Sequence, residues 1–500
     1  MRKLDMTYTF YELDMYPGGL YGHDEQDRKE IEMPSWMCCL FTMLALGCPT
    51  SDSGQEVLKP SDLFSQAKHL SRNVLEDESI QTIQALLLMV IPSQYENLMK
   101  SLYLANTDLR GLGWIFLGDA IRLAQLLGLH RNDAALQYTD PIEREARRRL
   151  WWTLYEFERY SSRSAGLTIR FSSMANGCPS SIHDNDSDTA LPSESFLTPG
   201  DYTPAGYIAA SVSLAQISGH IFQAMYSVPP QGVTNSRGNR LSRRTIADLY
   251  GELIRWRHDV NPNLRINPSA QSEQMDPSVK RALSFLDLRF QFAIISVTRP
   301  ILFRLVSATR DGSFNSLSTE TQTFIKTYAD ACTQSARSSL LTLKFMLQHD
   351  LLNNVLWLDT FYILSTAMVL LLEYLRASSP TEGHRVNECI SILRNLQPRG
   401  TGRNVLASLS ELAVYLGLES LAPTEQNSAL DLQFYELFSS TTPSQANTPG
   451  LPSPEISLAG FGGFAFPVGM GNVGDQMNGF NEFSWMDQIV RMAYEEFGPG

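Results

Sequence analysis

The sequence lacks clustered cysteines. Its 500 residues contain six, and no two of them form a CxxC pair: Cys38, Cys39, Cys48, Cys178, Cys332 and Cys389. Zinc–thiolate sites need ligands that short loops bring together, so this spacing argues against a metal site. Sparse, irregular cysteines are also typical of a reducing compartment. The sequence therefore predicts free core cysteines and no bound metal or other cofactor.

The chain also lacks an excess of basic residues. Forty Lys and Arg stand against 53 Asp and Glu, which gives a formal net charge of −13. Phosphate contacts need a basic footprint, so the chain as a whole is not expected to bind nucleic acid. The negative charge is concentrated at the end of the sequence, because residues 423–500 contain nine acidic residues and one basic residue, Arg491.

No hydrophobic run is long enough to cross a bilayer. The most apolar stretch is Thr360–Leu372, which lies between Asp359 and Glu373, whereas a transmembrane helix needs about 20 residues. We expect a buried core helix there and no membrane contact. No apolar run follows the basic N-terminal residues, so no secretory signal is expected. The motifs GxSxG, HExxH and GxxxxGK[ST] are absent as well, and no catalytic residue is predicted.

Helical periodicity dominates from about residue 31 to residue 422, and no sustained alternation supports a sheet. The sequence predicts an all-α fold with one large multi-helix domain over 31–422. It places a poorly defined leader at 1–30, mobile surface loops at 172–204 and 229–240, and a disordered Ser-, Pro- and Gly-rich linker at 423–480.

The string DPIEREARRRLWWTLYEFERYSS, from Asp140 onward, begins like a helix. Asp140 is a suitable N-cap, and Pro141 fits the first turn. Glu143 and Glu145 each precede an arginine by four residues, which is the favourable order for ion pairs on a helix. The pattern predicts an amphipathic helix with internal ion pairs and at least one tryptophan in the core, in preference to a DNA-contacting surface.

Two strings in this region, LGDAIRLAQLLGLHRN and then DPIEREARRRLWW, resemble the regulatory (middle homology, or xylanolytic-activator-type) domain of fungal zinc-cluster transcription factors. The resemblance is best over 33–192. In place of the Gly-Arg-Pro that this family usually carries after the tryptophan helix, the chain has Gly166-Leu167-Thr168. The residues that carry the motif, which the resemblance marks as structural or regulatory, are Arg122, Gly128, Leu129, His130, Arg147, Arg148, Arg149, Trp151 and Trp152.

The resemblance implies a fungal-type transcription regulator that is not an enzyme and works in the nucleus, alone or shared with the cytoplasm. Such factors contact DNA through a six-cysteine module that holds two zinc ions. This module is missing here, either because the sequence is truncated or because the module was lost. Implied partners are coactivators or other transcription proteins, and a homo- or heterodimer stays open. The alternative is a co-regulator or scaffold that pairs with a related factor and does not bind DNA; a helical small-molecule receptor overlaps both readings.

A separate segment, residues 481–497, follows the linker. Its apolar side chains recur at helical spacing and acidic residues flank them. Short acidic and aromatic helices of this kind dock into grooves on coactivators. The alternative is a helix that docks back onto the domain. The candidate activation face consists of Trp485, Ile489, Met492 and Phe497.

Overall fold

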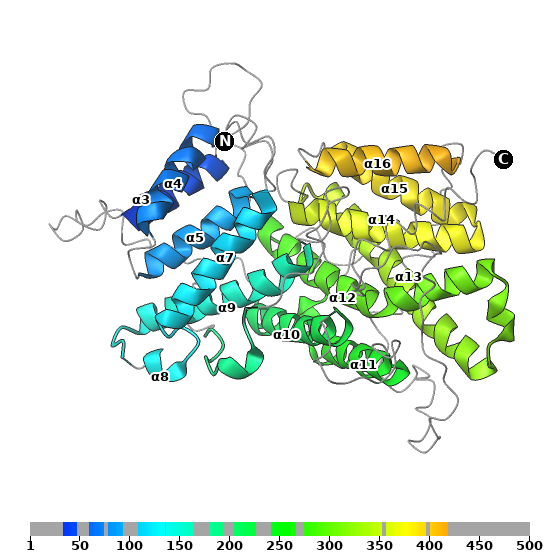
Figure 1. Cartoon of the computed structure of the whole chain (residues 1–500), viewed down its shortest axis with the longest axis horizontal. Coiled ribbons are helices and arrows are strands. Elements are labelled where there is room, and N and C mark those ends of the chain that lie inside the picture. Colours follow the sequence, from blue (N-terminus) through cyan, green and yellow to red (C-terminus); the bar gives the residue numbers. More distant parts are fainter. Residues whose placement is uncertain are drawn as a thin grey trace, which may run out of the picture.

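The regular elements of the computed structural model are helices throughout its described part, which confirms the predicted all-α class (Figure 1). The described residues are 34–47, 60–74, 79–93, 109–135, 137–164, 181–193, 204–226, 242–266, 275–352, 357–396 and 401–418. The predicted leader, the loop 229–240, the linker and the segment 481–497 lie outside them, and so does most of the loop 172–204.

Six of the helices that the structure describes belong to the N-terminal half. They are α3 (Pro34–Gly47), α4 (Pro60–Val74), α5 (Ile80–Ser93), α7 (Leu109–Leu126), α8 (Asn132–Ala135) and α9 (Pro141–Ser164). The inward faces of α3, α4, α5, α7 and α9 share one hydrophobic core, to which Phe64, Ile83 and Trp151 contribute fully buried side chains.

Glycine ends α7 in the way the sequence predicted. Gly128 adopts a φ of 71°, a left-handed conformation that costs glycine little. The Leu129 amide then donates to the Ala124 carbonyl at 2.9 Å, and the Gly128 amide donates to the Gln125 carbonyl at 3.0 Å. This pair of bonds is a Schellman motif, and it turns the chain toward His130.

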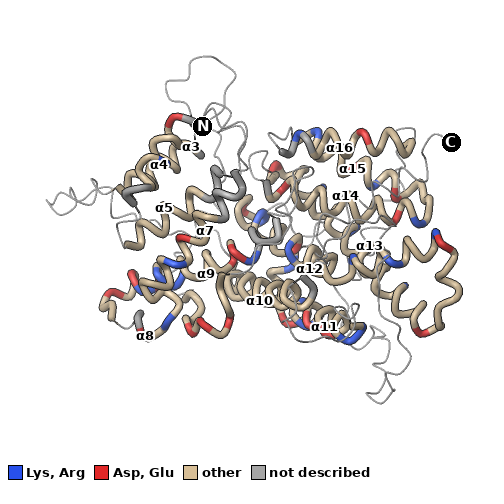
Figure 2. Tube along the Cα trace, viewed as in Figure 1, with Lys and Arg blue, Asp and Glu red and all other residues tan. Residues whose placement is uncertain are grey.

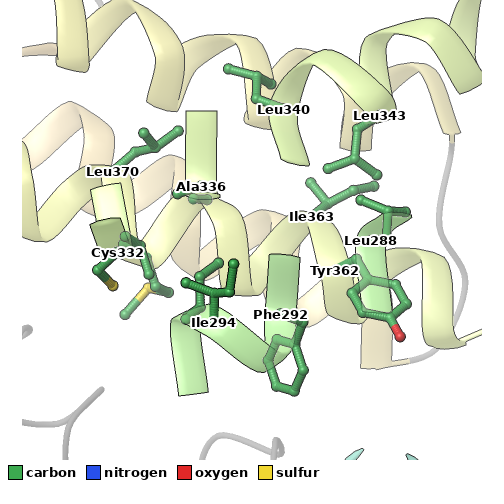
Figure 3. Close-up of a cluster of buried hydrophobic side chains, with 14 of the residues drawn as sticks. Leu288, Phe292, Ile294, Cys332, Ala336, Leu340, Leu343, Tyr362, Ile363 and Leu370 are labelled. Atoms are coloured by element: carbon green, nitrogen blue, oxygen red, sulfur yellow. The ribbon is translucent and has the colours of Figure 1, made fainter. Parts of the chain in front are cut away.

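The C-terminal half contains α10 (Tyr207–Tyr226), α11 (Arg243–Asp259), α12 (Pro277–Arg310), α13 (Thr319–Gln348), α14 (Trp357–Ala377), α15 (Pro380–Leu396) and α16 (Thr401–Tyr415). Short 3₁₀ turns are η2 (Asp184–Asp186), η4 (Pro262–Leu264) and η5 (Ser313–Ser316). The long helices α12 and α13 pack along each other, and α14 lies against both. Figure 3 shows their shared core, where Ile294, Cys332 and Leu370 meet.

Two described helices, α12 and the Leu358–Ala377 part of α14, are long and apolar enough to span a bilayer by length and composition alone. Both are mostly buried inside the protein. The predicted core helix Thr360–Leu372 lies within α14, and its position in the centre of the C-terminal half accounts for its apolar composition.

Helix α10 joins the two halves, because it contributes to both cores. Val212 and Ala215 lie in the N-terminal core, whereas Leu214 and Ile221 lie in the C-terminal core. Figure 1 shows the same arrangement, with α10 between α9 and α12. A rotation of one half against the other would therefore expose apolar surface on α10.

A buried ion pair crosses the same junction. The Arg289 guanidinium on α12 donates to the Glu156 carboxylate on α9 at 3.2 Å and to the Ser211 hydroxyl on α10 at 2.8 Å. Burial raises the pKa of Glu156, and the neighbouring Arg289 opposes that rise. Removing one partner of such a pair leaves an uncompensated charge in a site with little water.

We expect Arg289→Met to lower the free energy of unfolding by about 3–5 kcal/mol, because Glu156 loses its cation. The double variant Arg289→Met with Glu156→Leu should regain much of this loss, since the charge that needed a partner is gone. Urea unfolding monitored by circular dichroism measures both. Arg255→Met, at an exposed position on α11, is the control and should change stability little. A double variant as unstable as the single one would contradict the ion-pair explanation.

Candidate functional site

The motif helix α9 forms with the cap and the ion pairs that the sequence predicted. The Asp140 carboxylate accepts a hydrogen bond from the Ile142 amide at 2.9 Å. Arg147 lies 3.1 Å from Glu143, and Arg149 lies 3.1 Å from Glu145. Basic and acidic residues consequently lie close together on α9 (Figure 2). The predicted ion pairs of this helix are confirmed.

The three consecutive arginines do not form an open basic surface. Arg149 is buried against Glu145, with 7% of its side chain exposed. Arg147 retains 12% exposure and lies 3.6 Å from the centre of the Tyr138 ring, a cation–π contact. Arg148 is the most open of the three, at 30%, and lies 3.9 Å from Glu145. Two of the three guanidinium groups, those of Arg147 and Arg149, thus bind other side chains of the domain.

Both tryptophans of the motif are buried, with 1% of Trp151 and 8% of Trp152 exposed. The Trp151 ring lies 5.8 Å from the His130 ring, centre to centre. The Trp152 indole N–H donates to the Ala190 carbonyl at 2.9 Å. The prediction that at least one tryptophan faces the core is confirmed, and Trp152 additionally holds a segment far away in sequence.

That segment, residues 181–193, lies along α9 in the opposite direction, and we call it the strap. At one end the Glu158 carboxylate accepts hydrogen bonds from the backbone amides of Ser181 and Ile182. At the other end the Ser193 amide donates to Glu145 at 2.8 Å. The sequence favoured a mobile loop over 172–204. Within that range, residues 181–193 have both ends bonded to buried carboxylates, a pairing that composition does not reveal.

The opposite edge of the strap is bonded to the turn that follows α7. The Asp188 amide donates to the His130 carbonyl at 3.1 Å, and the Thr189 hydroxyl donates to the Leu129 carbonyl at 2.7 Å. In return, the Asn132 amide donates to the Asp188 carboxylate at 2.9 Å. The strap therefore joins the two motif strings, which lie on different helices, into one structure.

Asp184, within the strap, pairs with a buried arginine. Arg159 donates to the Asp184 carboxylate at 2.6 Å, and the Tyr155 hydroxyl donates to the same oxygen at 2.6 Å. The Arg159 guanidinium also lies 4.7 Å from the centre of the Tyr155 ring. It packs closely against Gly219 of α10, where a Cβ atom would come within 3.2 Å of it. Burial raises the pKa of Tyr155, so this hydroxyl remains a donor.

A histidine extends the arrangement to the C-terminal half. One ring nitrogen of His220 on α10 lies 4.0 Å from Asp184, and the other lies 3.2 Å from Glu252 on α11. No motif in the sequence marks Arg159, Glu158 or His220. The available signal was the charged pair Glu158-Arg159 among the aromatic residues Tyr155, Phe157 and Tyr160 of a core helix.

The remaining motif residues have structural positions. Arg122 is exposed and lies 3.0 Å from Asp119 of its own helix, and Leu129 is buried in the N-terminal core. Burial lowers the pKa of His130, which favours the neutral ring beside Trp151. The candidate activation face, Trp485, Ile489, Met492 and Phe497, lies outside the described residues.

In the described ranges, burial limits the reactivity of the cysteine thiols, and the acidic side chains do not form metal-binding clusters. Four cysteines lie buried there as free thiols, and burial raises the pKa of Cys38 and of Cys332 to about 12. Thiols with so high a pKa are poor nucleophiles and poor zinc ligands. Among the residues that the structure describes, no three His, Cys, Asp or Glu side chains gather as a metal site. The contacts described above hold helices together.

The structure thus defines an all-helical domain that is built around the motif helix α9 and its strap. Residues 8–258 match the model of the fungal specific transcription factor domain. The chain belongs to this family, which confirms the resemblance that the two motif strings indicated. The matched range ends within α11, so it includes the whole N-terminal half, the strap and α10.

Several curated fungal proteins are similar to the chain. "Activator of stress genes protein 1" of Candida albicans is 26% identical over 425 residues, which is 77% of this chain and 38% of that protein. "Nitrogen assimilation transcription factor nirA" of Emericella nidulans is 25% identical over 289 residues, 54% of this chain and 30% of that protein. "Zn(2)-C6 fungal-type transcription factor pigI" of Monascus ruber is 35% identical over 124 residues, 24% of this chain and 15% of that protein.

The chain spans well under half the length of these relatives, and their names describe transcription regulators, as predicted. No solved structure matches the chain.

We expect Asp184→Asn to loosen the strap, because buried Arg159 loses its carboxylate partner. The loss of a hydrogen bond to a charged group costs about 1–3 kcal/mol. Amide hydrogen exchange of residues 181–193 should become clearly faster, while exchange in α13 stays slow. The matched control is Asp186→Asn, two residues away on an exposed side chain, which should leave exchange unchanged. Equal effects of the two substitutions would show that the Asp184 contacts do not hold the strap.

Proposed function

We propose that this chain is the regulatory and activating part of a fungal transcription regulator that acts in the nucleus. The family match and the names of the relatives support this proposal. The observation that carries it is the strap: Trp152 donates to its Ala190 carbonyl, and Glu145, which pairs with Arg149, accepts the amide of Ser193. A rigid helical body of this kind suits protein contacts better than duplex contacts.

The proposed role is not enzymatic. In the described residues, ionisable side chains around the strap form ion pairs with one another: Glu145 with Arg149, Arg159 with Asp184, and Glu156 with Arg289. A general acid or base must be able to reach a substrate proton. Carboxylates that are fixed to guanidinium groups or backbone amides do not meet that requirement.

Contact with DNA is proposed to need a separate zinc-cluster module. A six-cysteine cluster would require all six cysteines of this chain, yet Cys38, Cys39, Cys332 and Cys389 are buried in two different cores. This same observation favours a second candidate function, a co-regulator that reaches DNA only by pairing with a related factor. Both candidates share the partner class, namely coactivators or other transcription proteins.

We expect the purified chain to bind neither stoichiometric zinc nor a specific duplex. The buried thiols are protonated near neutral pH, and the net charge of −13 repels phosphate. Elemental analysis by mass spectrometry and electrophoretic mobility shifts with a random duplex library measure this. About two zinc ions per chain, as a binuclear cluster would hold, would refute the proposal that DNA contact needs a separate module.

A reporter assay tests the activating role. The whole chain, fused to an unrelated DNA-binding domain, should activate a reporter gene through its apolar and acidic C-terminal segment. Replacing Trp485, Ile489 and Phe497 by alanine should abolish activation, because these side chains form the face that enters a coactivator groove. The control pair Ser484→Ala with Arg491→Ala, which helical spacing places opposite that face, should retain it.

Circular dichroism and thermal melting of both variants check that the domain remains folded. Activation that survives the triple change would remove the segment from the mechanism. A silent wild-type fusion would argue against an activator and favour the non-activating co-regulator.

A further inference from the structure

Helix α3 is apolar around its whole circumference. Its sequence, PSWMCCLFTMLALG, contains no charged residue. One face is buried: Cys38, Cys39 and Thr42 have 0–2% of their surface exposed and pack toward α4 and α5. A helix that is hydrophobic all round is normally covered on all sides or lies in a membrane. With 14 residues, α3 is too short to span a bilayer.

The face of α3 opposite the buried one carries four large apolar side chains, Trp36, Met37, Leu40 and Leu44. Trp36, Met37 and Leu40 are partly exposed, and Leu44 is 45% exposed. At 100° per residue these positions fall on one stripe along the helix. We call it the α3 stripe. Its helix lies at the end of the N-terminal half farthest from α10 (Figure 1).

We propose that the α3 stripe is a self-association surface, which pairs with the α3 stripe of a second copy in an antiparallel arrangement. The stripe is symmetric about Leu40, because Trp36 precedes it by four residues and Leu44 follows it by four. A twofold axis at Leu40 therefore places the large Trp36 ring against the smaller Leu44 of the other copy. Such self-complementarity is what a twofold interface requires.

Charge also favours a second copy as the occupant. Two chains of net charge −13 repel each other, with much of that charge in residues 423–500. Helix α3 bears no charge (Figure 2), so contact there brings together the least like charge. The helices α4 and α5, which pack against α3, carry exposed polar residues, among them Asp62, Gln66 and Gln81. An apolar centre of Trp, Met and Leu with a polar rim is the usual composition of a protein interface.

The stripe is small, so the association is weak. Stable dimers bury about 800 Å² on each partner, and one helix of 14 residues provides only part of that area. Dissociation constants for such limited contacts are about micromolar or weaker. The dimer should form and dissociate with protein concentration. This inference concerns assembly alone and does not depend on the proposed role in transcription.

Sedimentation equilibrium of the full chain tests the proposal. The average mass should rise from that of one chain toward twice that value as concentration increases. Leu40→Glu should keep the chain monomeric, because the twofold axis would place two carboxylates face to face. The control Ala407→Glu adds the same charge at an exposed position on α16 and should associate like the wild type.

A charge swap separates a lost interface from a lost fold. Leu40→Lys alone should also be monomeric, and an equal mixture of the Leu40→Glu and Leu40→Lys chains should associate again. Wild-type chain that stays monomeric at every concentration would overturn the proposal, as would a Leu40→Glu variant that associates normally. Monomeric wild type combined with a lower melting temperature of Leu40→Glu would assign the stripe to a segment of the same chain and would equally refute self-association.

Discussion

Helix α9 buries several charged side chains, and the need to pair each of them governs the middle of this structure. A buried charge without a partner costs several kcal/mol. Glu158 binds backbone amides of the strap, and Arg159 binds Asp184. Glu156 reaches across the junction to Arg289 on α12. These three partners come from distant parts of the sequence, so pairing the charges of one helix fixes the positions of the strap and of α12.

The junction between the two cores depends on α10 as much as on α9. Because α10 contributes apolar side chains to both cores, neither half can lose it without exposing hydrophobic surface. The polar contacts then set the orientation: Arg289 meets Ser211 on α10, and His220 on α10 lies between Asp184 and Glu252. Apolar packing holds the halves together, and directional bonds fix how they face each other.

The family motif acquires a physical meaning in this arrangement. Leu129 and His130 offer carbonyl groups to the strap, and Trp152 offers its indole N–H. Arg149 positions Glu145, which in turn binds the Ser193 amide. These residues resemble a binding surface in the sequence because they are basic and aromatic. In the structure they connect parts of one domain, and the surfaces open to partners lie elsewhere, for instance on α3.

Local interactions explain why so much of the helical class could be predicted from the sequence. Periodicity, the Asp140 cap, the Gly128 turn and the four-residue spacing of Glu145 and Arg149 act within one or two helical turns. The strap could not be predicted, since its bonds join residues that lie 23 to 60 positions apart. Which side of α3 stays open was equally undetermined, because an evenly apolar helix has no periodicity that marks one face. Only tertiary packing selects that face.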